Sequence, residues 1–422
     1  MERSPTLVRA VSRWQIVGLG LNDVVGSGVY LLPAAAAALL GPSSVWAVMA
    51  AGAAVAILVL VFAEASSHFD EPGSAYLYAR TAFGSLVGLE VGLMAWIARV
   101  ASVASLSVGF SQALGYLWPP VTTGWGRALV ISLPILILTG LNIVGVRFGV
   151  GAAMVLLACK MLPLLLFVSA GVFAASLDTV AGQPPGSGRL GEAALLLLFA
   201  YAGFENTPAP AGEYRNPRRD VPFALITNVC LVTLLYSSVQ WIALGILPNA
   251  AASATPLADA AGMVMGGWAG TLLTLGAALS ILGTNSNSVL AGPRYLLALA
   301  RDGFGPAFLG RVHPRFHTPA AAILVQGLIC LPLALTGTFT TLATLSVVAR
   351  LATYLTTAAA VPVLRRRMPH AQGALRLPAG DLIAAAAVVL SLGLAASATM
   401  ANLLAAGAAL AVGAVVYATR RR

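Results

Sequence analysis

The stretch 199–222 reads FAYAGFENTPAPAGEYRNPRRDVP and closes an apolar run that begins near residue 190. Gly203, Pro208 and Pro210 interrupt this run. Inside a helix, a glycine costs about 1 kcal/mol relative to alanine, and a proline removes a backbone hydrogen bond. The sequence therefore predicts a helix that is broken within the run.

A second apolar run, 14–39, carries the same kind of interruption at Gly26-Ser27-Gly28. Counting runs of about 20 apolar residues, the length that crosses a bilayer, places the two interruptions five spans apart. Paired breaks at corresponding positions of two halves are typical of inverted-repeat transporters, whose substrate site lies at the breaks. Because five is odd, one half must be inverted in the membrane relative to the other.

The composition of the whole chain is that of a polytopic membrane protein. Of its 422 residues, 59% are hydrophobic and 9% are charged, whereas about 25% of the residues in soluble domains are charged. The same hydrophobicity excludes an intrinsically disordered chain. Twelve apolar runs predict transmembrane helices at 14–39, 44–67, 85–114, 128–145, 150–175, 190–212, 222–247, 266–292, 319–336, 339–364, 381–398 and 401–418.

Arginines in the loops predict the orientation. With the N-terminus in the cytoplasm, 19 arginines fall in cytoplasmic segments, and only Arg127 and Arg189 fall outside. Cytoplasmic loops carry such an excess of basic residues, which explains the net charge of +10 without nucleic acid as a partner. The N-terminus lacks the apolar core and cleavage site of a signal peptide. We expect a multi-pass protein of the inner or plasma membrane with both termini in the cytoplasm.

The residues at both interruptions resemble the amino acid–polyamine–organocation (APC) superfamily. The first run contributes GSGVYLLP at 26–33, and the stretch 199–222 is the most specific match, with GFE at 203–205, Glu213 and Asn216-Pro217. Further matches are PGSAY at 72–76, Arg294, Arg301-Asp302-Gly303 and Thr318-Pro319. The resemblance covers residues of about 13–365. It implies a five-plus-five inverted-repeat, LeuT-like fold that transports amino acids or related amines.

The span count and the resemblance together predict an all-α polytopic membrane protein with twelve transmembrane helices, of which the first and sixth are discontinuous. The expected parts are a cytoplasmic N-terminus at 1–13, repeat 1 at 14–175, repeat 2 at 190–364, two further spans at 381–418 and a cytoplasmic C-terminus at 419–422. The connections are short, so we expect no separate soluble domain.

A broken helix offers the groups that a zwitterionic amino acid needs. Free N–H groups at a helix N-terminus favour a carboxylate, free carbonyls favour an ammonium, and no unpaired charged side chain has to be buried. We expect residues 26–28 (Gly, Ser, Gly) to hold the carboxylate and the carbonyls of residues 199–201 (Phe, Ala, Tyr) to hold the ammonium, as the resemblance implies. The predicted substrate-binding residues are Val25, Gly26, Ser27, Gly28, Phe199, Ala200, Tyr201 and Gly203.

Two aromatic residues at the second break, Tyr201 and Phe204, are candidates for a gate over the site. Aromatic packing between helices is the alternative explanation for both residues. Glycines at the breaks likewise have an alternative role, because small residues allow helices to pack closely in membranes. Two interrupted helices at corresponding positions favour the binding role for the glycines.

Lys160 is the only lysine and lies in the apolar stretch LLACKMLPLLLF at 156–167. Burial favours the neutral form of a lysine because the ammonium loses its hydration, and lysine, unlike arginine, can release its proton. Sodium-independent transporters of the resembled fold carry a lysine here in place of a sodium ion. The resemblance therefore implies a cation site in which the Lys160 ammonium contacts the first break and hydroxyls of the eighth span, for which Ser280 and Thr284 are the candidates. The alternative is a fixed structural cation.

Other charged residues at membrane depth are candidates for functional sites by default. Asp23 lies one turn before the first break and is a candidate proton relay or a contact for a cationic substrate. Structural pairing is the favoured interpretation for Asp23 and for the other five residues, whose partners cannot be assigned from sequence: Glu64, Glu90, Arg99, Glu205 and Arg350.

These features predict a secondary active transporter that moves amino acids by alternating access. Proton symport without sodium is favoured because of Lys160, and an amino acid or polyamine exchanger is the alternative. An intramembrane enzyme would need a catalytic set at one depth, and a channel would need repeated polar rings. The expected partners are an amino acid, protons and the lipid bilayer. Neither a cofactor nor a metal is expected, because the four histidines are too dispersed for a zinc site.

Overall fold

The structure, a computed structural model, describes residues 9–70, 73–144, 150–176, 189–247, 249–369 and 374–420. Within these ranges the chain forms helices and connecting loops, with one isolated β-bridge between Val11 and Tyr214. Parts of the predicted cytoplasmic termini, residues 1–8 and 421–422, lie outside the described residues, and so does Pro72 of the PGSAY motif.

Most of the α-helices overlap predicted apolar runs. Their bounds are α1 Arg13–Val24, α2 Gly28–Leu40, α3 Ser44–Ser67, α4 Ser74–Phe83, α5 Ser85–Leu114, α6 Gly124–Val144, α7 Val150–Ala174, α8 Leu190–Tyr201, α9 Pro217–Ile246, α10 Pro256–Met265, α11 Gly267–Arg301, α12 Ala320–Thr336, α13 Phe339–Arg367, α14 Gly380–Ala396 and α15 Met400–Arg420. However, α8 ends before the end of the run 190–212, and α11 extends beyond the run 266–292.

Eight stretches of described helix are long and apolar enough to cross a membrane. One of them, Gly28–Ser67, contains both α2 and α3, and three further apolar helices, α8, α12 and α14, are shorter. Large apolar side chains stay exposed on the outer helices, including Leu129 at 65% and Phe173 at 91%. Apolar surface of this extent is stable in lipid and unfavourable in water. The protein is therefore an all-helical, multi-pass membrane protein.

Two helices were not predicted from the sequence, α4 and α10, because each has only ten residues and neither contains a long apolar run. Each leads directly into a long helix through a glycine in a left-handed conformation. Gly84 connects α4 to α5 with φ of 91°, and Gly266 connects α10 to α11 with φ of 88°. Only glycine adopts such angles without strain, which explains a sharp change of chain direction at these two points.

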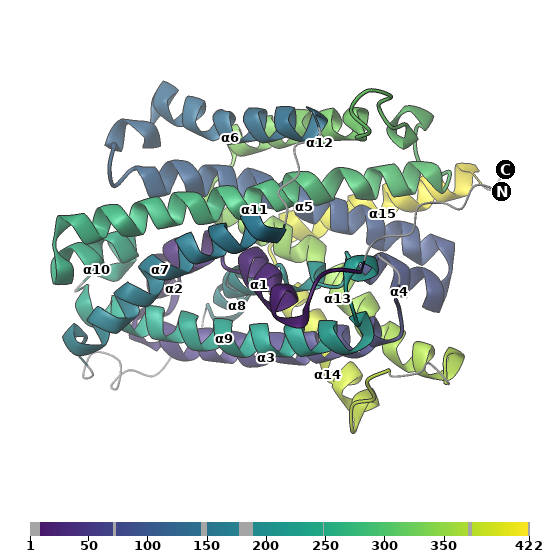
Figure 1. The fold of residues 1–422 in the computed structure, drawn as a ribbon, viewed down its shortest axis with the longest axis horizontal. Coiled ribbons are helices and arrows are strands. Elements are labelled where there is room, and N and C mark those ends of the chain that lie inside the picture. Colours follow the sequence, from purple (N-terminus) through teal and green to yellow (C-terminus); the bar gives the residue numbers. More distant parts are fainter. Residues whose placement is uncertain are drawn as a thin grey trace.

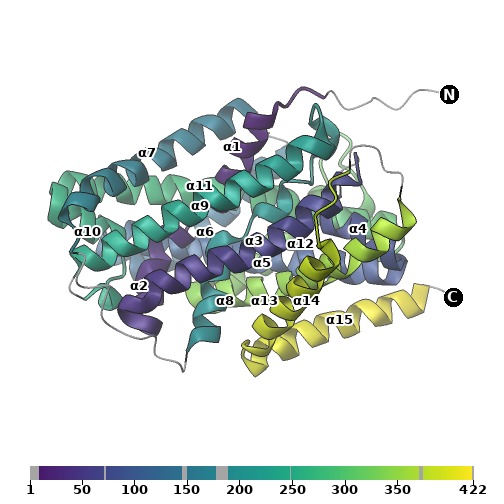
Figure 2. The ribbon, with the colours of Figure 1, turned by 90° about the horizontal axis from the view of Figure 1, so that it is seen from below.

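Long helices enclose the two interrupted ones. α5 packs along α11 and α13, and α3 packs along α9; Figure 1 shows α5 and α11 running beside each other along the long axis of the molecule. α6 and α12 form one edge (Figure 1), and α14 and α15 lie at another edge (Figure 2). α1 contacts α7, α9 and α11, whereas α2 contacts α8. Side chains from several sequence-distant helices therefore meet at the interruptions.

Contacts between the connecting segments fall into two groups, one on each predicted side of the membrane. Three ion pairs join segments that the sequence predicts to be cytoplasmic: Arg13 to Asp220 at 2.9 Å, Arg218 to Asp70 at 3.0 Å and Arg80 to Asp302 at 3.0 Å. Arg127, predicted on the opposite side, donates to the carbonyls of Leu335 and Gly337, which lie at the C-terminal end of the predicted ninth span. Each of these contacts joins two segments on the same predicted side.

Candidate functional site

The first helix is interrupted between α1 and α2. α1 ends at Val24, Val25 is extended with φ of −74° and ψ of 92°, and α2 begins at Gly28. The backbone N–H groups of Gly26, Ser27 and Gly28 donate no hydrogen bond to another described residue. Unpaired N–H groups at a helix N-terminus carry partial positive charge and bind anions. The break therefore presents three donors suited to a carboxylate.

The second interruption follows α8, which ends at Tyr201. Ala202 is extended, with φ of −67° and ψ of 142°, and Gly203 has φ of 129°. A short 3-10 helix, Phe204–Asn206, then replaces the α-helix. A residue with a side chain would be strained at the Gly203 conformation, so this glycine determines where the chain leaves the helix.

The two interruptions lie against each other, as predicted from the sequence. A Cβ atom added to Gly28 would lie 2.7 Å from the Cα atom of Ala200. A Cβ atom added to Gly203 would lie 2.9 Å from the carbonyl oxygen of Asp23. Both distances are shorter than non-bonded carbon and oxygen atoms tolerate. The glycines are therefore needed here for close approach of two backbones.

Tyr236 on α9 connects the interruptions and was not predicted. Its buried hydroxyl lies 3.1 Å from the carbonyl oxygen of Val24, at the first break, and 3.1 Å from that of Ala200, at the second. A hydroxyl has one proton, so it donates to one of the two carbonyls at a time. No sequence pattern identified this residue, because the contact spans 212 positions in the chain.

We expect Tyr236→Phe to loosen the contact between the breaks. The variant removes the one proton that the carbonyls of Val24 and Ala200 share, and an unmade buried hydrogen bond costs about 1–3 kcal/mol. Purified protein should unfold at a lower temperature, and substrate uptake should fall several-fold. Tyr214→Phe is a matched control, since the buried Tyr214 hydroxyl donates to the carbonyl of Thr207, beyond the 3-10 helix, and does not join the two breaks. Equal uptake by the two variants would contradict a special role for Tyr236.

Lys160 on α7 is fully buried and contacts the first break. Its Nζ atom donates to the carbonyls of Asn22 and Val25, both at 2.7 Å. Ser280 on α11 donates to the same Val25 carbonyl at 2.9 Å. The side chains of Lys160 and Ser280 therefore meet at one carbonyl of the broken helix, but no hydrogen bond joins them to each other in the described part of the chain.

Two other predicted residues of the cation site lie close by without contacting the Lys160 ammonium. Thr284 is beside the break, since its Oγ1 atom lies 3.2 Å from where a Gly26 Cβ would be, and it has no hydrogen-bond partner among the described residues. The Asp23 carboxylate accepts hydrogen bonds of 2.8 Å from Asn206 and Asn287. These two amides, which the sequence analysis missed, hold Asp23 at the interface of both breaks.

A cavity of about 20 Å³ lies between the interruptions. Its walls include these residues of the two breaks: Asp23, Val24, Gly26, Ser27, Gly28, Phe199, Ala200, Ala202 and Gly203. Thr284, Ser102, Arg99 and Arg350 also line it. Such a volume accommodates about one water molecule. In this structure the cavity is therefore closed, and it is too small for an amino acid.

The two candidate gate residues do not line this cavity. Tyr201 is buried and donates to the carbonyl of Val48 on α3 at 3.0 Å. Phe204 is also buried and packs against Phe62 and Tyr354, with ring centroids 5.4 and 5.3 Å apart. In this form of the protein both rings pack between helices.

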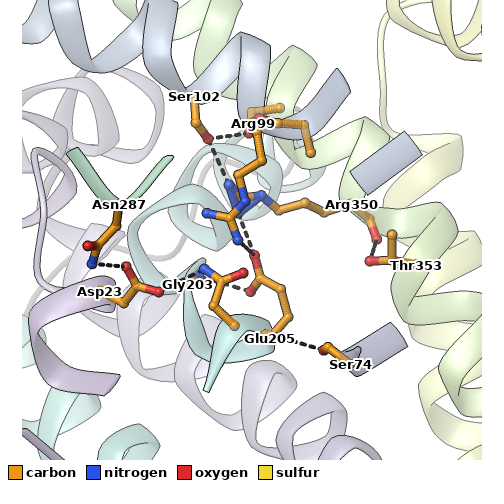
Figure 3. A network of polar contacts seen from close by, with 12 residues as sticks. Asp23, Ser74, Arg99, Ser102, Gly203, Glu205, Asn287, Arg350 and Thr353 are labelled. Atoms are coloured by element: carbon orange, nitrogen blue, oxygen red, sulfur yellow. Dashed lines mark hydrogen bonds and ion pairs between the residues drawn. The ribbon is translucent and has the colours of Figure 1, made fainter. Parts of the chain in front are cut away.

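Glu205 of the GFE motif pairs with arginines from two other helices (Figure 3). Its Oε1 atom lies 2.7 Å from Arg350 Nη1 and 3.8 Å from Arg99 Nη2. Its Oε2 atom accepts from the backbone N–H of Gly203 at 2.9 Å and from the Tyr354 hydroxyl at 3.2 Å. Glu205 therefore fixes the second break to α5 and α13.

The remaining acids at predicted membrane depth differ in their surroundings. Glu64, only 1% exposed, pairs with Arg365 and also accepts from the backbone N–H of Leu377. Glu90 on α5 lies beside α15, and its buried Oε2 atom has no hydrogen-bond partner among the described residues. Neither acid is near the two breaks, so they are not part of the candidate site.

Comparison with known proteins agrees with this architecture. The chain is 26% identical over 406 residues to the branched-chain amino acid permease BcaP of Bacillus subtilis (strain 168), covering 92% of this chain and 87% of that protein. It is 27% identical over 393 residues to the methylthioribose transporter of the same organism, covering 89% and 85%. It is also 27% identical over 388 residues to the vacuolar cationic amino acid transporter 2 of Arabidopsis thaliana, covering 87% of this chain and 61% of that protein.

A family model described as amino acid permease matches residues 11–419. The match includes both interruptions, Lys160 and the last two helices. Members of such a family are transporters and not enzymes, and an amino acid substrate is implied. With nearly the whole length matched, this chain belongs to the amino acid permease family of the APC superfamily.

Proposed function

We propose that this protein is a secondary active transporter that moves an amino acid across the cell membrane by alternating access. The observation that carries the proposal is the contact between the two helix breaks, with three unpaired N–H groups on one of them. The relatives support an amino acid as the substrate, since two of the three described above are named for amino acids.

The proposed architecture has twelve spans in two inverted repeats, at 14–175 and 190–364, followed by two spans at 381–418. Support comes from α4 and α10, each of ten residues and each joined by a left-handed glycine to the helix of the third span of its repeat. α4 lies on the predicted cytoplasmic side and α10 on the opposite side. Two equivalent elements on opposite sides are expected of inverted repeats.

The proposed orientation has both termini in the cytoplasm of the cell membrane. Support comes from the arginine distribution and from the ion pairs that connect predicted cytoplasmic loops only with one another.

In the proposed site, the α-carboxylate of the substrate binds the N–H groups of Gly26, Ser27 and Gly28. The ammonium group binds carbonyls of residues 199–201. One of these, the Ala200 carbonyl, already accepts from Tyr236, but a carbonyl oxygen has two lone pairs and can accept a second donor. The closed cavity opens when the segments at the two breaks tilt, and Tyr201 and Phe204 move with the second break as gates.

Lys160 is the proposed coupling residue. While its ammonium is charged, it holds the carbonyls of Asn22 and Val25 and so stabilises this arrangement of α1. Loss of the proton weakens both bonds, because a neutral amine is a poorer donor than an ammonium. Proton movement would thereby be linked to movement of the first helix. In the exchange alternative, Lys160 stays charged throughout the cycle.

Uptake into proteoliposomes tests the proposed function. Purified protein reconstituted into liposomes should accumulate at least one amino acid from a radiolabelled panel when an inward proton gradient is imposed, with no response to sodium. Counterflow without any response to the proton gradient would favour the exchanger. Absence of both uptake and counterflow for the whole panel would contradict amino acid transport.

A further inference from the structure

Two buried arginines lie in the wall of the cavity between the breaks. Arg99 comes from α5 and Arg350 from α13, and each is only 5% exposed. Figure 3 shows both guanidinium groups gathered beside Gly203 and Glu205. A guanidinium group stays protonated in proteins, so both positive charges persist inside the membrane. A buried charge is costly unless it is paired.

The described residues supply one carboxylate to these two arginines. Arg350 is the main partner of this carboxylate, because its Nη1 atom lies 2.7 Å from Glu205. It also donates a 2.7 Å hydrogen bond to the Ser102 hydroxyl. The other acid in the cavity wall, Asp23, instead accepts from the amides of Asn206 and Asn287. In Figure 3 its carboxylate points toward Asn287 and not toward the arginines.

The guanidinium N–H groups of Arg99 have no hydrogen-bond partner among the described residues. Its distance of 3.8 Å to Glu205 is too long for a hydrogen bond, and it donates no hydrogen bond to another described residue. Arg350 also keeps a buried Nε–H without a partner among the described residues. Both side chains line the cavity between the helix breaks, and free donors on a guanidinium group are suited to an anion.

We propose that Arg99 recognises a second negative charge on the substrate, so that the transported amino acids are those with a carboxylate in the side chain. This inference rests on the proposed function, in which residues 26–28 bind the α-carboxylate. The side-chain carboxylate then binds Arg99, while Glu205 holds Arg350 in place as a positioning residue. Binding of the acid supplies the negative charge that this part of the site lacks.

Competition for uptake measures this preference. In wild-type proteoliposomes, L-aspartate or L-glutamate should compete at least tenfold more strongly than L-asparagine or L-glutamine, which have the same shape without the charge. Arg99→Gln should remove the preference by raising the KM for the acids at least tenfold relative to the amides. Arg99→Lys, which keeps the charge, should retain it. Arg127→Gln is the matched control, because Arg127 donates to carbonyls at the C-terminal end of α12 and does not line the cavity.

The possible failures are distinguishable. Uptake of neutral amino acids with no preference for acids would overturn this inference and leave the proposed function intact. Absence of all amino acid uptake would overturn both. If Arg99→Gln does not fold, thermal unfolding of the wild-type protein tests the proposed subsite at Arg99 instead. A higher unfolding midpoint with glutamate but not with glutamine would support it. A higher midpoint with glutamine but not with glutamate would contradict it.

Discussion

Lys160→Met is expected to abolish accumulation of substrate driven by a proton gradient. Methionine fills a similar volume but cannot donate to the carbonyls of Asn22 and Val25, which now receive two 2.7 Å bonds. Bonds from a charged donor contribute about 1.5–3 kcal/mol each, so the first break loses a large part of its support. We expect initial uptake to fall at least tenfold and its dependence on external pH to disappear, as measured in proteoliposomes.

Ser280→Ala is the control for this variant. It removes a neutral hydroxyl from the same Val25 carbonyl and leaves the ammonium in place. Uptake should fall less than in Lys160→Met, and its response to pH should remain. Wild-type levels of proton-driven accumulation by Lys160→Met would contradict the coupling role. A pH-independent wild-type protein that Lys160→Met inactivates would indicate a fixed structural cation.

Gly28→Ala is expected to remove most of the transport activity without preventing folding. Alanine is the better helix former, so the local helix should not suffer. The added methyl group, however, would lie 2.7 Å from Ala200 Cα and 2.8 Å from Ala200 Cβ, and neither neighbour is a flexible side chain. The two breaks must separate by several tenths of an ångström, and a binding site is sensitive to shifts of this size. Uptake should fall at least tenfold.

Gly140→Ala in α6 is the matched control for this steric effect. A Cβ atom at Gly140 would have no neighbour within 4 Å among the surroundings described, so the same chemical change occurs without a clash. This variant should transport like the wild type. Full activity of Gly28→Ala would mean that the close approach of the two breaks is not needed for transport.

The sequence predicted those parts of the fold that depend on local properties. Apolar runs are dictated by the thickness of the bilayer, so α3 and α5 begin and end where the composition changes. The interruptions were visible because glycine and proline weaken helices wherever they occur. Lys160 was conspicuous as a charge in an apolar run, and its contact with the first break followed from the resemblance.

Other parts of the site depend on distant residues meeting in space, and these were not predictable. Tyr236 is an ordinary tyrosine in an apolar helix until the fold brings it to two carbonyls of the breaks. Asn206 and Asn287 carry no charge that would mark them, yet they hold Asp23. Arg99 and Arg350 were noticed as charges, but their common partner Glu205 could not be assigned without coordinates.

The central claim is that the two breaks together bind both charged groups of an amino acid. The thermal unfolding midpoint of the purified protein tests this most directly, because a ligand that binds the folded form stabilises it by about 2.7 kcal/mol at 100 times its Kd. The transported amino acid should raise the midpoint, whereas its decarboxylated amine and its N-acetyl derivative, each lacking one charge, should not. Equal stabilisation by either analogue would contradict binding of both charged groups by the two breaks.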